Sequence, residues 1–158
     1  MSSLNNPIPV SNFFKRMTTI TINSKLKADT FELGQLNGQT LLLMKNSLVP
    51  WFIVLPNTHE TELFKLDKSE RAKLDKNIDL LSGFLVNHFK TEKLNIATIG
   101  NIVSQMHVHI IGRCVDDPFW PGVVWGQAKK TEYKKEEVER MIQLLSHEFT
   151  NHFCKALL

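Results

Sequence analysis

Several features that define large protein classes are missing from this sequence. Its 158 residues include two cysteines, Cys114 and Cys154, which form no CxxC motif and are too few for a disulfide framework. The longest apolar runs, such as Leu41–Met44 and Trp51–Leu55, are far too short to cross a bilayer. The first ten residues lack the charged start and apolar core of a signal peptide. We therefore expect a cytoplasmic protein with reduced thiols and no membrane partner.

The sequence also lacks the usual marks of nucleic-acid binding and of glycine-rich nucleotide loops. The formal net charge is +3, and the basic residues are spread along the chain without a run. We therefore expect no nucleic-acid partner. Neither GxGxxG nor GxxxxGK[ST] occurs, so nucleotide binding through either loop is not expected. The apolar fraction of 42% is enough for a core, and the length suits one domain over residues 1–158.

Alternating apolar residues predict a mainly antiparallel sheet of about five strands. Asn37-Gly38 lies between two strand-like runs and predicts a hairpin, because both residues accept a positive φ. Trp51–Leu55 is expected to be largely buried, and Pro56 ends it. The expected strands cover residues 31–36, 39–44, 51–55, 94–99 and 105–113.

Two stretches with helical spacing predict two main helices. The first begins at Asp67, which with Glu70 suits a capping box, and ends at about residues 88–90. The second, C-terminal helix covers about residues 132–153. Apolar residues define the core faces of these helices: Leu74, Ile78, Leu81 and Leu85 in the first, and Val138, Met141, Leu145 and Phe149 in the second. The expected fold class is α+β, with two helices packed on an antiparallel sheet.

The most informative stretch is Gln105-Met106-His107-Val108-His109-Ile110-Ile111-Gly112-Arg113. In a strand, alternate side chains share a face, so Gln105, His107 and His109 would point the same way. Three interpretations are open. The histidines could be hydrogen-bonded surface residues, they could bind zinc or iron with further ligands, or His107 could be a nucleophile that attacks phosphorus. The third interpretation accounts best for two imidazoles and an amide on one face.

This stretch resembles the HxHxHxx signature of the histidine-triad (HIT) family. His107 and His109 match the second and third histidines, the residues between them are apolar, and Gln105 stands in place of the first. Trp51–Pro56 and Trp120-Pro121-Gly122 are also similar to family segments, and the resemblance covers about residues 15–126. The nearest resemblance is to bacterial proteins described as similar to diadenosine tetraphosphate hydrolases.

The resemblance implies a HIT-like fold and a hydrolase or transferase that acts on nucleoside phosphates, without a metal or cofactor. It implies that His107 attacks the α-phosphate to form a covalent nucleotidyl-histidine, and that His109 contacts the phosphate. The expected substrate is a nucleoside phosphate or dinucleoside polyphosphate. A homodimer is expected by family analogy alone. The rival interpretations are a nucleotide-binding module with little catalysis and a metalloprotein that uses both histidines.

Two departures from the family pattern bear on the leaving group. Gln105 can donate a hydrogen bond but cannot change charge, and Trp51 stands where several branches carry another histidine. Polyphosphate is stable as an anion, whereas an amine needs a proton to leave. The departures therefore favour dinucleoside polyphosphates over phosphoramidates.

Three further residues are candidate ligands for the nucleotide. Asn101 and Ser104 precede the histidines where the family places polar groups around phosphate, with a simple turn as the alternative. Asn46 lies near the position where the family binds ribose hydroxyls, with an ordinary loop asparagine as the alternative.

Overall fold

The computed structural model describes residues 20–156. Within this range, no helix combines the length and the apolar character that crossing a membrane requires. The elements follow in chain order: α1 (Ser24–Asp29), β1 (Thr30–Leu36), β2 (Gln39–Met44), β3 (Trp51–Leu55), the 3₁₀ helix η1 (Leu63–Lys65), α2 (Lys68–His88), β4 (Lys93–Ala97), β5 (Val108–Arg113), α3 (Lys135–Glu148) and β6 (Phe153–Lys155).

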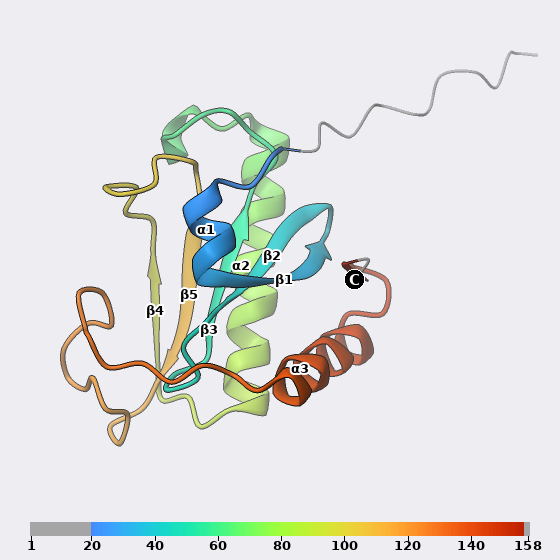
Figure 1. Ribbon diagram of the computed structural model, residues 1–158. Helices are drawn as coiled ribbons and strands as arrows, with labels where there is room; N and C mark the ends of the chain where they lie inside the picture. Colours follow the sequence, from blue (N-terminus) through green and yellow to red (C-terminus); the bar gives the residue numbers. More distant parts are fainter. Residues whose placement is uncertain (1–19, 157–158) are drawn as a thin grey trace, which may run out of the picture.

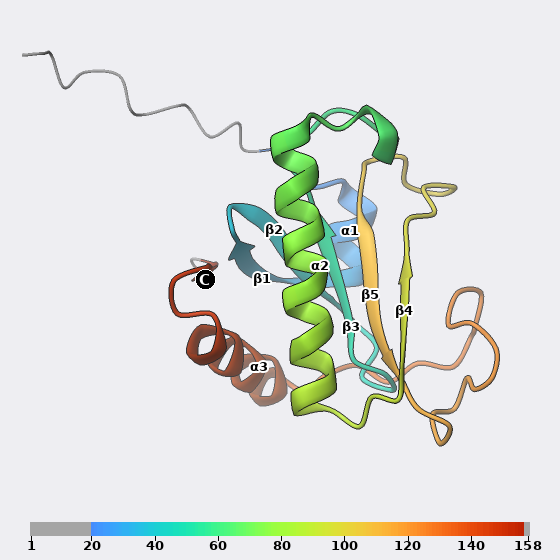
Figure 2. The ribbon, with the colours of Figure 1, turned by 180° about the vertical axis from the view of Figure 1, so that it is seen from behind.

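The strands form one antiparallel sheet in the order β4-β5-β3-β2-β1-β6. Side chains of α2 and α3 share a core with one face of this sheet, and Figure 2 shows α2 lying across that face. Helix α1 lies on the opposite face (Figure 1), where a second core also includes Phe119 and Val124 of the loop between β5 and α3. The expected α+β class with an antiparallel sheet is therefore confirmed.

The β1–β2 hairpin and the core faces of both main helices agree with the sequence patterns. Asn37 and Gly38 have φ values of 49° and 77°, as the turn requires. The apolar stripe of α2 faces the sheet, and that of α3 packs against the same core. Buried members of these stripes are Leu74, Leu81 and Leu85 of α2, and Met141 and Leu145 of α3.

The expected strand number was wrong, because the sheet has six strands rather than about five. The predicted second helix was too long, because α3 ends at Glu148 and the chain then forms β6 from Phe153 to Lys155. β6 pairs with Gly34–Leu36 of β1. Gly34 makes this close approach sterically feasible: its φ is +146°, and a Cβ there would lie 2.1 Å from the carbonyl oxygen of Cys154. Helix α1 was also not predicted, because six residues are too short to show helical periodicity.

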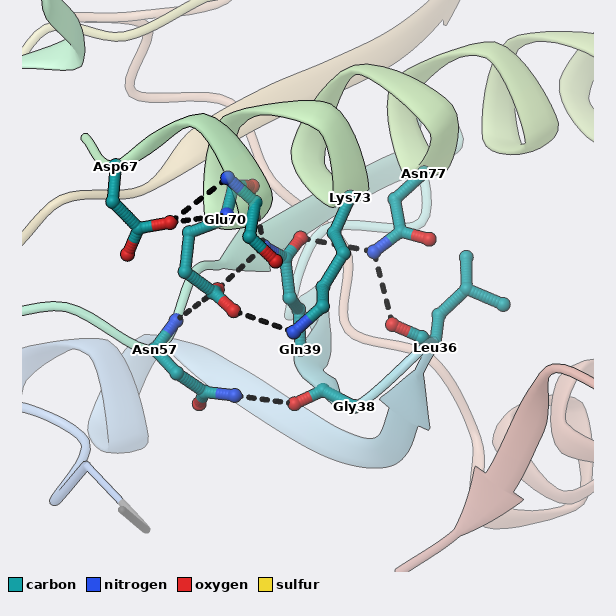
Figure 3. Close-up of polar contacts among 9 residues, drawn as sticks. Leu36, Gly38, Gln39, Asn57, Asp67, Glu70, Lys73 and Asn77 are labelled. Atoms are coloured by element: carbon teal, nitrogen blue, oxygen red, sulfur yellow. Dashed lines mark hydrogen bonds and ion pairs between the residues drawn. The ribbon is translucent and has the colours of Figure 1, made fainter. Parts of the chain in front are cut away.

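Helix α2 begins with an N-cap that differs in part from the predicted capping box. Asp67 Oδ1 accepts hydrogen bonds from the backbone N–H groups of Ser69 and Glu70, both at 2.9 Å. The carboxylate of Glu70 does not return to Asp67. It accepts instead from Gln39 Nε2 at 3.0 Å, from the Asn57 N–H at 3.1 Å and from Lys73 Nζ at 2.7 Å (Figure 3). This carboxylate therefore ties α2 to the β1–β2 hairpin and to the turn after β3.

The surroundings of Glu70 make part of the stability dependent on pH. Burial alone would raise the pKa of this carboxyl, but the hydrogen bonds from Lys73, Gln39 and the Asn57 N–H outweigh it and lower the pKa. Because the folded-state pKa is lowered, the contribution is present above the unfolded value, roughly 4.3, and is lost as pH falls through the folded value.

We expect Glu70→Gln to lower the free energy of unfolding by about 1–2 kcal/mol at neutral pH, because a hydrogen-bonded charge is removed. The difference from wild type should shrink as the wild-type carboxyl becomes protonated. Urea unfolding at several pH values measures it, with Glu62→Gln as the control, since Glu62 is exposed. An equal loss of stability at every pH would show that the ionised form contributes nothing.

Candidate active site

His107 immediately precedes β5, and His109 is the second residue of β5, on the sheet face that carries α1. Val108 and Ile110 belong to the core beneath α2, so the alternation of the strand turns His109 to the opposite face. His109 is paired in register with Ile53 of β3. The predicted strand was too long at its start, because β5 begins at Val108 and His107 precedes it.

The backbone next to His107 determines which ring nitrogen carries the proton. His107 Nδ1 lies 2.6 Å from the carbonyl oxygen of Gln105. A carbonyl oxygen can only accept, so Nδ1 of His107 donates. In the neutral ring, the lone pair is then on Nε2. This is the form in which an imidazole can attack phosphorus.

The surroundings of His109 select the opposite tautomer. Trp51 Nε1 lies 2.9 Å from His109 Nδ1, and an indole N–H can only donate. His109 Nδ1 therefore accepts, and the single proton of the neutral ring is on Nε2. Burial, with a smaller effect from neighbouring His107, lowers the pKa of His109 to about 3. His109 is therefore a neutral hydrogen-bond donor across the physiological pH range.

The rings of His107 and His109 are neighbours, and their Nε2 atoms have complementary roles, since one carries a lone pair and the other a proton. Their centroids lie 4.9 Å apart in an edge-on arrangement, and the residues are 6% and 5% exposed. Within residues 20–156, neither Nε2 atom has a hydrogen-bond partner. The fully buried side-chain atoms without a partner there do not include either Nε2. The ring of His107, with its lone pair on Nε2, thus neighbours the ring of His109, with its proton on Nε2, and neither Nε2 is bonded within the described residues.

The side chain of Gln105 is held by the segment that leads into α1. Its Oε1 accepts from the Asn23 N–H at 2.8 Å, and its Nε2 donates to the Thr21 carbonyl oxygen at 3.1 Å. Both ends of the amide are therefore used, and the hydrogen bond to His107 comes from the Gln105 backbone. The sequence placed Gln105 in one row with the histidines, but it lies ahead of the strand.

The structure places the three other predicted residues at separate positions. Ser104 is exposed and lines a cavity of about 410 Å³ with Gln105, and Asn101 is exposed on the preceding loop. Asn46 lines a different cavity of about 240 Å³, which Trp51 and Trp125 also line. The structure therefore does not bring these three residues together around the histidine pair.

Asn46 also has a structural role within its loop. Its Oδ1 accepts hydrogen bonds from the N–H groups of Leu48 and Thr131, each at 3.3 Å. It therefore fixes the loop after β2 against the segment before α3. The amide nitrogen of Asn46 has no hydrogen-bond partner within the described residues.

The sequence patterns missed the aromatic support of His109. Trp51 and Trp125 both pack edge-on against its ring, with centroid distances of 5.6 Å and 5.4 Å. The register of β3 and β5 carries the signal that could have found Trp51. Ile53 pairs with His109 and Trp51 pairs with Ile111, so Trp51 and His109 are diagonal neighbours on one face. Trp125 comes from a loop and has no such signal.

Metal-binding geometry is absent from the described part of the chain. No group of three or more His, Cys, Asp or Glu side chains within residues 20–156 is arranged to hold a metal ion. The histidine pair therefore has no third protein ligand of these types in place there.

Comparisons with known proteins agree with the sequence resemblance. The HIT domain family matches residues 25–115. A histidine triad protein from Bradyrhizobium japonicum is 35% identical, with a TM-score of 0.77 over 82% of this chain and 97% of its own. Histidine triad proteins from Sinorhizobium meliloti and Marinobacter aquaeolei are 34% and 31% identical. Each has a TM-score of 0.78 and covers 84% of this chain, and 98% and 97% of its own chain respectively. No significant match was found among curated proteins.

Proposed function

Because this chain belongs to the HIT domain family, we propose that it is a nucleotidyl hydrolase or transferase that acts on nucleoside phosphates. The observation that carries the proposal is the pairing of the His107 Nε2 lone pair with the His109 Nε2–H on a neighbouring ring. A nucleophile and a donor for the developing negative charge are the two groups that displacement at phosphorus needs. The family supplies the substrate class.

In the proposed reaction, His107 Nε2 attacks the α-phosphorus and forms a P–N bond. The bond from that phosphorus to the bridging oxygen breaks, and the rest of the substrate leaves as a phosphate anion. Water, or another acceptor in a transferase, then breaks the P–N bond and releases the nucleoside monophosphate and free His107. During both steps, the His109 Nε2–H donates to a phosphoryl oxygen, whose negative charge increases.

The bonding of Gln105 supports substrates whose leaving group needs no proton. Its amide is bound at both ends to the backbone of Thr21 and Asn23, and an amide cannot act as an acid. Dinucleoside polyphosphates fit this requirement, since the departing polyphosphate is already anionic. The same argument disfavours phosphoramidates, whose amine must be protonated.

The proposed nucleotide ligands come from two loops. Ser104 and Asn101 lie on the loop that leads to His107, and their exposed side chains suit contacts with the phosphate chain. The free amide nitrogen of Asn46, in the hollow beside Trp51, suits a ribose hydroxyl. His107, His109 and Gln105 make up the catalytic centre of the proposal, with Gln105 acting through its backbone carbonyl.

Trapping the covalent intermediate tests the proposal. The protein is mixed with diadenosine tetraphosphate, quenched in alkaline denaturant, since a P–N bond is acid-labile, and digested with trypsin. The peptide 94–113 contains both candidate histidines and no other. We expect an adenylyl group on His107. Turnover without an adduct on this peptide, or an adduct on His109, would contradict the mechanism.

One observation favours a second candidate, a nucleotide-binding module with little catalysis. The first histidine of the family signature is replaced by Gln105, whose side chain is occupied in holding the chain before α1. Calorimetry with AMP and a turnover assay on the same preparation separate the two. Tight binding of AMP without turnover of any dinucleoside polyphosphate would support the binding module.

A further inference from the structure

Trp51 and His109 form a buried hydrogen bond in which the indole N–H can only donate, whereas the imidazole nitrogen could either donate or accept. Trp51 is 6% exposed, and the only polar atom of its side chain, Nε1, is directed at His109 Nδ1 over 2.9 Å. An indole nitrogen has no lone pair to offer, so this contact holds only while Nδ1 of His109 is unprotonated. A histidine at position 51 would not impose this, because an imidazole can donate or accept.

We propose that Trp51 is a positioning residue that fixes His109 as a neutral Nε2–H donor toward the substrate phosphate. Protonation of His109 at Nδ1 would place two N–H groups against each other in a buried contact. The indole therefore opposes both the other tautomer and the cationic ring. The part of this proposal that concerns the phosphate rests on the proposed function, whereas the tautomer of His109 does not.

The other neighbours of His109 cannot replace this effect. From its own segment it meets His107, from β3 it meets Trp51 and Ile53, and from the loop before α3 it meets Trp125. β4 contributes Ala97, its register partner on the other side. Within the described residues, His107 is the only titratable neighbour, and its Nδ1 is engaged by the Gln105 carbonyl. Trp51 is thus the group that selects the protonated nitrogen.

This arrangement has a consequence for the reaction. A neutral imidazole N–H can donate a hydrogen bond to a phosphoryl oxygen and stabilise its charge, but it is too weak an acid to protonate a leaving group. Because His109 is neutral, it also exerts no charge repulsion on the protonated form of His107. Trp51 and Gln105 therefore have the same consequence for the reaction, since neither arrangement supplies an acid that could protonate the leaving group.

The test combines NMR of the histidine rings with kinetics. Long-range ¹H–¹⁵N spectra report which nitrogen of His109 carries the proton. We expect the Nε2–H form in the wild-type protein at neutral pH. Trp51→Phe keeps an aromatic ring but removes the donor, so His109 should show a mixture of tautomers. Trp51→His should also give a mixture.

The matched control is Trp125→Phe, because Trp125 packs against the same ring without a hydrogen bond to it. This variant should keep the wild-type tautomer of His109. In Trp51→Phe, we expect kcat to fall about tenfold or more, with a smaller change in KM. Complete loss of one such donor lowers kcat by roughly 10²–10³-fold in other enzymes.

Either of two results would overturn the proposal. One is a wild-type spectrum in which His109 carries its proton on Nδ1, and the other is an unchanged Nε2–H tautomer in both Trp51 variants. Absence of turnover with every nucleoside phosphate would contradict the proposed function instead, while the spectra would still decide the role of Trp51.

Discussion

Replacing His107 with alanine should abolish nucleotidyl transfer, with kcat lowered by roughly 10⁴-fold or more, as for loss of a catalytic nucleophile elsewhere. The reason is geometric. The Gln105 carbonyl directs the proton of His107 to Nδ1 and leaves Nε2 as the lone pair beside the His109 donor. His109 cannot take over, because Trp51 occupies its unprotonated nitrogen. The measurement is single-turnover hydrolysis of diadenosine tetraphosphate, with formation of the adenylyl adduct followed in parallel.

Two further variants make this result interpretable. His152→Ala removes an exposed imidazole near the C-terminal strand and should leave turnover unchanged. His107→Gly opens space in which added imidazole can act as the nucleophile, so imidazole should restore part of the turnover. Unfolding midpoints show whether each variant is folded. Wild-type turnover in a folded His107→Ala protein would exclude His107 as the nucleophile.

A second large effect is expected at a buried ion pair, where Asp117→Ala should destabilise the protein by about 3–5 kcal/mol. Arg113 Nε and Nη2 donate to the two carboxylate oxygens of Asp117 at 2.7 Å and 3.0 Å, and both side chains are nearly inaccessible to solvent. Removing the carboxylate leaves a buried guanidinium without its counter-charge. The guanidinium of Arg113 is therefore committed to the fold.

The pH dependence of this pair has a defined sign. Burial alone would raise the pKa of Asp117, but hydrogen bonds from Arg113 and from the Phe119 and Cys114 N–H groups outweigh it and lower the pKa. Stability from this pair is therefore present above the unfolded value, roughly 3.9, and is lost as pH falls through the folded value.

The neighbouring residue provides a matched control. Asp116→Ala removes a carboxylate that pairs with Lys90 at the exposed surface, where such pairs contribute about 1 kcal/mol or less. Thermal or urea unfolding of both variants at neutral pH measures the contrast. Equal stabilities would mean that the Arg113–Asp117 pair is no stronger than a surface pair.

The parts of the fold that were predicted from sequence are those with a long or repeated pattern. Helix α2 has 21 residues and carries an apolar stripe from Leu74 to Leu85, and Asn37-Gly38 determines the hairpin turn by conformational preference alone. Helix α1 and strand β6 have six and three residues, which is less than a period-based pattern needs. Their formation depends on contacts made by other segments, such as the close approach of β6 to Gly34.

The candidate site shows the same division between local and distant causes. The alternation of residues brought His107 and His109 together correctly, because that depends on neighbouring positions. The tautomer of His109 depends on Trp51, which lies 58 positions away. Gln105 binds Thr21 and Asn23 from 84 and 82 positions away. Its side-chain role could not be deduced from the HxHxH pattern, which includes only nearby residues.

Strand β6 also determines what the sheet presents at its edge beside β1. It pairs with Gly34–Leu36 and becomes the edge strand itself, with three residues. An uncovered edge is where strands of other molecules pair and where aggregation begins. Because Gly34 has no side chain, the backbone of β6 can approach β1 closely. One glycine thus allows a strand of three residues to take the sheet edge next to β1, and very short edge strands limit pairing with other chains.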